Sequence, residues 1–328
     1  MSFSIGEALR LMRETWPFLV FRAAVYFGIA VAYVLATGTG AGIGWTLGLF
    51  GSDEFQAGAA VWGGVFGFAG VAAVLYFLRE YTLYLVKAGH IAVMVEALDA
   101  RLLPEGKGQI AFAQGIVKER FGEASVLFAV DQLVKGVIRA VTGLVEGLAT
   151  LLPVPGLDGA MKVLRAYLRV AVGLLDEVIL AHGMRKRSDD PWGSAREALV
   201  LYGQNARAML VSAAWIALIT YALAFLVFLL MLGPAAAVVW LMPGGWSAGG
   251  FVFALLFAWA VKVALIEPFA IACLLQAFFK VTEGQVPDPD WIAKLEAASG
   301  KFRELGQKAQ EAVAKPRFHS SREAGEQA

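Results

Sequence analysis

A small set of ionisable side chains lies inside long apolar stretches of this 328-residue sequence, where charge is costly. Charges at such positions commonly line an ion pathway, a proton relay or a substrate site. Glu267 precedes Pro268, and a proline frees a backbone carbonyl in the preceding turn. This carboxylate and carbonyl together predict a site for a cation or a proton. The candidate pathway residues are Asp131, Lys135, Arg139, Asp176, Glu177, Lys262 and Glu267.

The same charges also have a structural interpretation. The stretches Phe121–Leu152 and Leu157–Gly183 flank a Pro-Val-Pro-Gly turn, which predicts an antiparallel helical hairpin. In that hairpin Lys135 comes near Asp176 and Glu177, so opposite charges meet. Pairing lowers the cost of placing charges in lipid. The sequence therefore leaves two alternatives open, a polar pathway or a set of ion pairs that fix helix register.

Composition points to a membrane protein. Hydrophobic residues make up 59% of the chain and charged residues 17%, whereas soluble domains have about 45–50% and about 25%. Phe18–Leu35, Ala57–Leu78, Ala208–Leu232 and Phe251–Phe279 approach or exceed the length of about 20 residues that a spanning helix needs. The chain is therefore predicted to be an all-α polytopic transmembrane helix bundle with about six spans. If residues 121–183 stay outside the bilayer, the number of spans is four.

The segments expected along the chain follow from this pattern. They are an interfacial amphipathic helix at 1–16, a first transmembrane hairpin with a cytoplasmic extension at 17–108, a charged central hairpin at 109–187, a second interfacial helix and transmembrane hairpin at 188–283, and a cytoplasmic amphipathic tail with a disordered end at 284–328. Glu7–Leu11 matches Glu197–Leu201 at an offset of 190 residues. Residues 188–283 are therefore a candidate repeat of 1–96, and such repeats are common in transporters.

The distribution of basic residues predicts the orientation. With six spans, the loops at 39–56, 153–157 and 233–249 would lie outside, and none of them contains Lys or Arg. Because basic residues favour the cytoplasmic side, we expect a cell-membrane protein with both termini in the cytoplasm. Apolar residues at 291–309 alternate three and four apart, which predicts either self-association or packing on the protein or the membrane surface.

No soluble-enzyme motif is present, so the chain is not expected to be an enzyme. No cofactor, metal or nucleic-acid partner is expected, and the lipid bilayer is the expected environment. The glycine run Gly38–Gly44 is expected to end the first span, either as a flexible turn or at a place of close helix packing. The pairs Gly40/Gly44 and Gly63/Gly67 predict close approach between helices.

The central hairpin resembles the late membrane region of choline-transporter-like proteins over residues 129–183. The similar pieces are Asp131–Val137 and Leu174–Leu180, the second of which precedes a polar break. The resemblance implies a helical membrane region. It implies no substrate, because the additional spans and the large extracellular domain of that family are not found in this sequence.

Two functions follow from these patterns. The leading hypothesis is transport or conduction of a small solute or ion through the helix bundle. The alternative is a membrane scaffold that recruits partners through its interfacial helices and its C-terminal tail.

Overall fold

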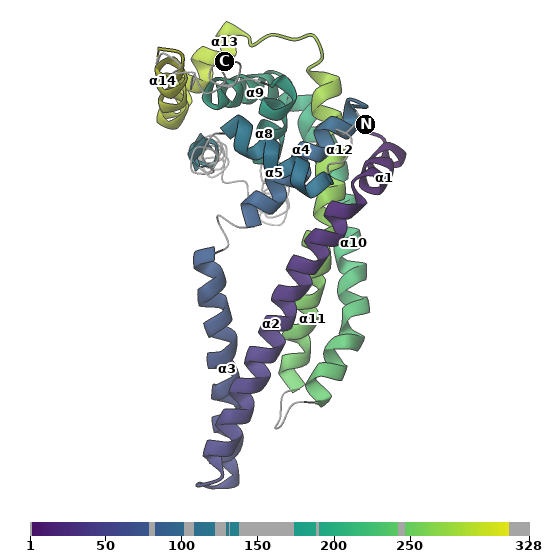
Figure 1. The fold of residues 1–328 in the computed structure, drawn as a ribbon, viewed down its shortest axis with the longest axis vertical. Coiled ribbons are helices and arrows are strands. Elements are labelled where there is room, and N and C mark those ends of the chain that lie inside the picture. The colour runs from purple at the N-terminus through teal and green to yellow at the C-terminus, as the bar shows by residue number, and fades with distance from the viewer. Residues whose placement is uncertain are drawn as a thin grey trace, which may run out of the picture.

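The structure is a computed structural model that describes residues 2–78, 83–101, 108–121, 129–130, 132–137, 174–187, 190–241 and 247–314. The described residues form helices and no strand, as predicted (Figure 1). The helices are α1 (Ile5–Glu14), α2 (Trp16–Gly48), α3 (Asp53–Leu78), α4 (Tyr84–Leu98), α5 (Gln109–Phe121), α8 (Leu175–Lys186), α9 (Pro191–Gln204), α10 (Ala206–Trp240), α11 (Ser247–Val261), the π-helical turn η2 (Lys262–Ile266), α12 (Glu267–Val281), α13 (Pro289–Ala298) and α14 (Gly300–Ala314).

The helices divide into two groups (Figure 1). Four long helices, α2, α3, α10 and α11, extend side by side away from the rest, and we call them the rods. The shorter helices α1, α4, α5, α8, α9, α13 and α14 gather around α12 at the other end, and together they form the head. At a rise of 1.5 Å per residue, the 33 residues of α2 extend about 50 Å. This length exceeds the hydrocarbon layer of about 30 Å, so α2 also reaches into the head.

Four helical stretches among the described residues are long and apolar enough to cross a membrane. They are Trp16–Gly48, Asp53–Tyr76, Ala206–Trp240 and Gly249–Val281. Large apolar side chains are exposed on the rods, Leu35, Phe66 and Leu230 among them. The arrangement is therefore compatible with an integral membrane protein, whereas the prediction of about six spans is not confirmed. Most of the predicted hairpin at 121–183 lies outside the described residues, and its described end, α8, is packed within the head.

The prediction that Gly38–Gly44 ends the first span is wrong, because α2 continues through these glycines to Gly48. The glycines serve close packing instead. A Cβ atom on Gly40 would overlap the carbonyl oxygen of Gly63 on α3, and one on Gly44 would overlap that of Ala59. The two backbones approach each other closely, as the paired GxxxG spacing predicted.

The loop predicted at 233–249 also begins later than expected, because α10 continues through Pro234 and ends at Trp240. The start of α9 follows from local sequence, since Asp190 and Pro191 are typical of the first positions of a helix. The Asp190 side chain accepts hydrogen bonds from the backbone N–H groups of Trp192 and Gly193, and Pro191 occupies the first helical position.

The junctions α1–α2 and α9–α10 share one local design. Thr15 and Asn205 each form a one-residue break, and they lie 190 residues apart, the offset of the candidate repeat. The Thr15 hydroxyl donates to the carbonyl of Leu11, and the Asn205 amide donates to the carbonyl of Leu201. This agreement at the matched positions supports the candidate repeat, which stays a prediction.

The tail helices α13 and α14 pack on α9 of the same chain, which is one of the alternatives that the sequence left open. Phe302 and Leu305 are fully buried in the core of the head. Arg196 on α9 forms an ion pair with Glu296 on α13 at 2.7 Å. The apolar side of the tail is therefore used within the protein.

Candidate functional site

A break in backbone hydrogen bonding marks the place where the rods meet the head. In η2 the N–H of Glu267 donates to the carbonyl of Lys262, five residues back. The next amide in this register belongs to Pro268, which has no N–H, so the carbonyl of Val263 loses its helical partner. Arg22 Nη2 donates to this carbonyl at 2.7 Å. A guanidinium of the chain itself therefore binds the carbonyl that was freed by Pro268, beside Glu267.

Further charges extend this contact into a cluster. Arg22 Nη2 lies 3.9 Å from Glu267 Oε2, and Lys87 Nζ lies 3.3 Å from Glu267 Oε1. Lys87 also forms an ion pair with Glu177, which is next to Asp176 on α8. We call Arg22, Lys87, Asp176, Glu177 and Glu267 the charge cluster. It joins α2, α4, α8 and α12, four helices that are far apart in the sequence.

The charge cluster is largely shielded from solvent. The side chain of Arg22 is 1% exposed and that of Glu177 is 2% exposed, whereas Lys87 and Glu267 are 22% and 20% exposed. An unpaired charge at such a depth costs several kcal/mol, so the pairs are a condition for burial. In the described part of the chain, no three His, Cys, Asp or Glu side chains are grouped to hold a metal ion.

The electrostatics of the cluster distinguish its two adjacent carboxyl groups. Burial and the neighbouring Asp176 raise the pKa of Glu177 well above its usual range. Burial also opposes ionisation of Asp176, but a hydrogen bond from Glu177 and the charges of Lys87 and Lys135 outweigh it and lower the pKa of Asp176. Burial opposes the charge on Lys87 as well, and the surrounding carboxyl groups overcome it and raise its pKa. The surroundings therefore favour the charged forms of Asp176 and Lys87, whereas burial opposes the charged form of Glu177.

The structure brings only some of the predicted pathway residues together. Asp176, Glu177 and Glu267 lie in the charge cluster, and Lys135 is near enough to lower the pKa of Asp176, as the hairpin argument predicted. Lys262 is exposed on η2 and forms no ion pair with a described residue. Asp131 and Arg139 lie outside the described residues.

Sequence reasoning missed the two cations of the cluster. Arg22 lies within the first apolar stretch, Phe18–Leu35, where its charge was overlooked because the stretch as a whole is apolar. Lys87 was placed on a cytoplasmic extension exposed to water. The signal that could have found them is charge balance, because a buried Glu267 requires a cation and Arg22 is the one basic residue in that stretch.

A buried histidine, His90, lies near Arg22 of the charge cluster. His90 is 1% exposed, stacks on Phe18 with ring centroids 5.3 Å apart, and places Nε2 3.0 Å from the Thr15 hydroxyl. That hydroxyl already donates its hydrogen to the carbonyl of Leu11, so Nε2 must be the donor to Thr15. Burial, and next the charge of Arg22, lower the pKa of His90 well below 6.5.

This histidine gives a prediction for pH dependence. Because the folded state holds His90 neutral, its contribution to stability is complete above pH 6.5 and is lost as the pH falls toward the lowered pKa. We expect the His90→Gln variant to lose less stability than the wild type between pH 7 and pH 5 (about the range in which a histidine titrates). Unfolding curves in detergent at several pH values measure the difference. Glu177 has a raised pKa, so its contribution to stability changes with pH in the opposite direction to that of His90. Because Glu177 is present in both proteins, its contribution cancels when the two curves are compared. Parallel curves would contradict a buried neutral His90.

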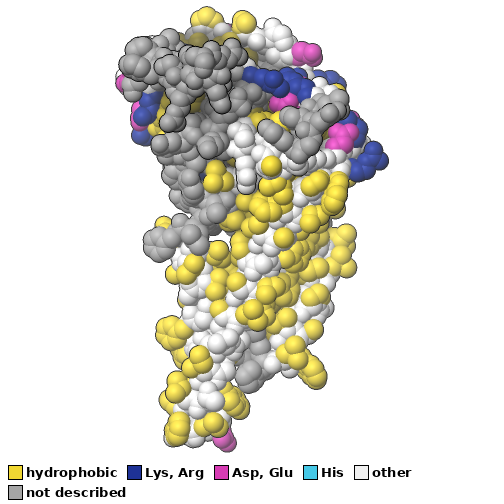
Figure 2. Space-filling view, viewed as in Figure 1, with side chains coloured by type: hydrophobic (Ala, Val, Ile, Leu, Met, Phe, Trp, Pro, Cys, Tyr) yellow, Lys and Arg dark blue, Asp and Glu magenta, His cyan; other side chains and the backbone are white. Residues whose placement is uncertain are grey.

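The rods themselves carry few charges. No Asp, Glu, Lys, Arg or His occurs in the described residues 27–48, 55–76, 208–240 or 247–261. Figure 2 shows the same division, with basic side chains gathered over the head and an acidic group at the far tip of the rods. The acidic residues at that tip are Asp53 and Glu54, in the first turn of α3. The charged side chains of the candidate spans therefore lie outside these four ranges, with Arg22, Lys262 and Glu267 among those on the side of the head and Asp53 and Glu54 at the tip.

A comparison with known proteins gives no match: no family model, no curated protein and no solved structure is significantly similar to this chain. The resemblance of residues 129–183 to choline-transporter-like proteins therefore gains no support from the comparison. The functional argument rests on the charge cluster and on the rods.

Proposed function

We propose that this protein is a membrane-anchored scaffold, in which the rods hold a helical head at one face of the bilayer. The observation that carries the proposal is the location of the charges. Glu177 and Glu267, two of the carboxylates predicted to line a pathway, are paired with Arg22 and Lys87 where the rods enter the head. Residues 27–48, 55–76, 208–240 and 247–261 of the rods offer no charged group to guide an ion or a polar solute across the hydrocarbon layer.

The proposal includes an orientation. Both described ends of the chain belong to the head, since α1 and α14 lie there (Figure 1). The basic side chains gather on the head, and the tip of the rods carries only Asp53 and Glu54. By the preference of basic residues for the cytoplasmic side, the head faces the cytoplasm of the cell membrane.

The proposal also assigns a role to the head surface. Ile5, Leu9 and Trp16 are exposed along α1 and at the start of α2, where an amphipathic helix lies in the membrane interface. The polar outer faces of α13 and α14 are then presented to the cytoplasm as the surface that partners contact. A scaffold needs these two properties, a fixed depth in the membrane and an accessible rigid surface.

Single cysteines test this function, and we expect three different labelling patterns with a membrane-impermeant maleimide. The variants Ser52→Cys, Glu283→Cys and Ala254→Cys are made in a Cys273→Ala background, because Cys273 is the one native cysteine. We expect Ser52→Cys at the tip to react in intact cells, and Glu283→Cys in the head to react only after the cells are opened. Ala254 is fully buried between α10 and α11, so Ala254→Cys is expected to stay unlabelled until the protein is denatured.

The same labelling distinguishes a scaffold from a transporter. A water-filled pathway through the rods would admit the reagent to Ala254→Cys in the folded protein, and that result would overturn the proposal in favour of transport. Labelling of Glu283→Cys in intact cells would overturn the orientation. The Ser52→Cys variant shows that the reagent reaches the protein, so a lack of reaction elsewhere is informative.

A further inference from the structure

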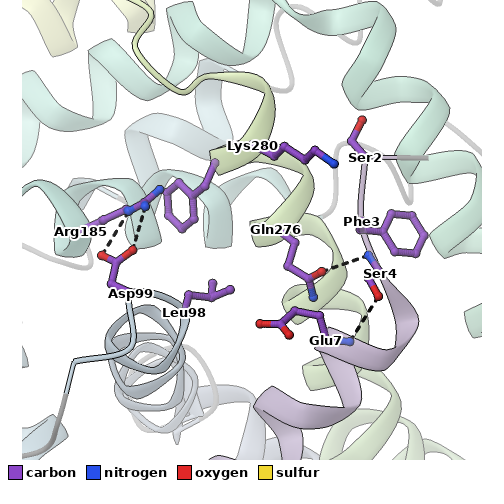
Figure 3. Close-up of a pocket in the computed structure, with 10 residues that line it drawn as sticks. Ser2, Phe3, Ser4, Glu7, Leu98, Asp99, Arg185, Gln276 and Lys280 are labelled. Carbon is purple, nitrogen blue, oxygen red and sulfur yellow. Dashed lines mark hydrogen bonds and ion pairs between the residues drawn. The ribbon is translucent and has the colours of Figure 1, made fainter.

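A pocket of about 330 Å³ opens in the head between the N-terminal segment, α1, the end of α4, α8 and α12 (Figure 3). This volume is at the lower end of the range of ligand sites, about 300–1,000 Å³. Phe3, Leu98 and Phe279 supply apolar wall, and charged, amide and serine side chains supply the remainder. The pocket is separate from the charge cluster, with which it shares no residue.

The acidic groups in the wall are already paired. Both oxygens of Glu7 accept hydrogen bonds from Arg10, which also keeps the pKa of Glu7 below its usual value. Asp99 is held by Arg185 at 2.7 Å and by Arg101 at 2.9 Å. The pocket therefore has no free carboxylate with which to bind a cation.

The unpaired groups in the wall are hydrogen-bond donors. Gln276 accepts a hydrogen bond from the backbone N–H of Ser4 through Oε1, and its buried Nε2 has no partner among the described residues. Lys280 lies one helical turn further along α12 and forms no ion pair with a described residue. A buried amide donor without a partner costs free energy, and a bound acceptor would remove that cost. The Lys280 ammonium and the Gln276 amide N–H therefore offer hydrogen-bond donors to an anion from one face of α12.

The pocket lies at the depth of the membrane surface. Helices α10 and α12 run antiparallel, and the Asn205 and Gln285 side chains hydrogen-bond to each other near their ends. Helix α10 packs against α12, and Met209 and Ile216 on α10 share the buried core of the head with Leu275 on α12. The neighbouring Val211 and Trp215 are exposed apolar side chains on α10, and tryptophan is typical of the membrane interface.

We propose that this pocket binds a phosphate anion carried by the headgroup of an anionic membrane lipid. Lys280 Nζ and Gln276 Nε2 donate to the phosphate oxygens, while Phe3 and Leu98 contact the apolar part next to it. A soluble phosphate ester has the same anionic chemistry, and its lack of an acyl chain distinguishes it in an experiment. The site fixes the depth of the head by binding the lipid surface directly.

The experiment measures binding of a fluorescent phosphatidylglycerol, and in a second arm of glycerol phosphate, to the full-length protein in detergent. The Lys280→Gln variant removes the cation, and the Gln276→Glu variant keeps the acceptor for Ser4 while replacing the donor by a negative charge. We expect each to weaken lipid binding by about tenfold or more, the loss that follows from a charge-assisted hydrogen bond. The control Lys294→Gln makes the same charge change on α13, outside the pocket, and should bind as the wild type does.

Each outcome decides the proposal. Lipid bound tightly by the wild type and weakly by both pocket variants supports it. Glycerol phosphate bound with the same variant dependence, without the lipid, supports the anion site and identifies a soluble ligand. Unchanged binding in both pocket variants, or an equal loss in Lys294→Gln, overturns it, because the attraction would then come from general surface charge.

Discussion

Replacing Arg22 by methionine is expected to reduce the free energy of unfolding by about 3–5 kcal/mol, the usual cost of removing one partner from a buried ion pair. The Arg22 guanidinium is fully buried, and it binds the carbonyl of Val263 and lies beside the carboxylate of Glu267. Without it the carbonyl of Val263 has no donor, and Glu267 keeps only Lys87 as a counter-charge. Methionine fills a similar volume, so the loss reports on charge and hydrogen bonding more than on packing.

The measurement is equilibrium unfolding of the purified protein in detergent, with Arg10→Met as the matched control. Arg10 also forms two ion pairs, to Glu7 and Glu14, but on the surface of α1, where such pairs contribute about 0–1 kcal/mol. A second variant, Arg22→Met with Glu267→Gln, should recover part of the loss because it removes the uncompensated carboxylate. Equal effects of Arg22→Met and Arg10→Met would mean that Arg22 is not part of a buried network.

The location of the charge cluster explains what the pairing achieves. Arg22 comes from α2, which leads from the rods into the head, and Lys87 comes from α4 within the head. The carboxylates come from α8 within the head and from the start of α12. Breaking a buried ion pair leaves an uncompensated charge, so a rotation of either helix that separates the partners is unfavourable. The cluster therefore fixes the head on the rods, as a scaffold requires.

Features with a local cause could be predicted from the sequence. The helix start at Asp190 depends on side chains within three residues, and the apolar stretches depend on length. The contact between Arg22 and Val263 joins residues 241 positions apart, and no spacing rule reaches that far. Glu267 and Pro268 did predict a freed carbonyl, since the missing N–H is a local property, but the Arg22 donor that reaches this carbonyl is a tertiary fact.

The glycine run shows a different reason for failure. In water, a stretch such as Gly38–Gly44 favours a turn because glycine gains little from helix formation. In a membrane every backbone group must be bonded within the helix, so the chain stays helical, and the missing side chains allow close packing instead. The pairs Gly40/Gly44 and Gly63/Gly67 correctly predicted close helix packing. The end predicted for the span at Gly38–Gly44 did not take this packing into account.

The Gly63→Ala variant is expected to loosen the contact between α2 and α3. The added Cβ would overlap the carbonyl oxygen of Gly40, which is backbone and cannot rotate away, so the helices must separate. Overpacking of this kind typically costs about 1–3 kcal/mol. The effect should be concentrated on α3, because among the described helices α3 packs mainly against α2.

The Gly58→Ala variant is the matched control on the same helix, since a Cβ at Gly58 meets no atom within 4 Å. Alanine favours a helix over glycine by about 1 kcal/mol, so this variant is expected to be neutral or slightly more stable. Unfolding in detergent by added denaturant compares the two. Opposite signs for the two variants would show that backbone contact, and not helix propensity, decides the role of the glycines. Equal effects would mean that α2 and α3 are further apart than the structure places them.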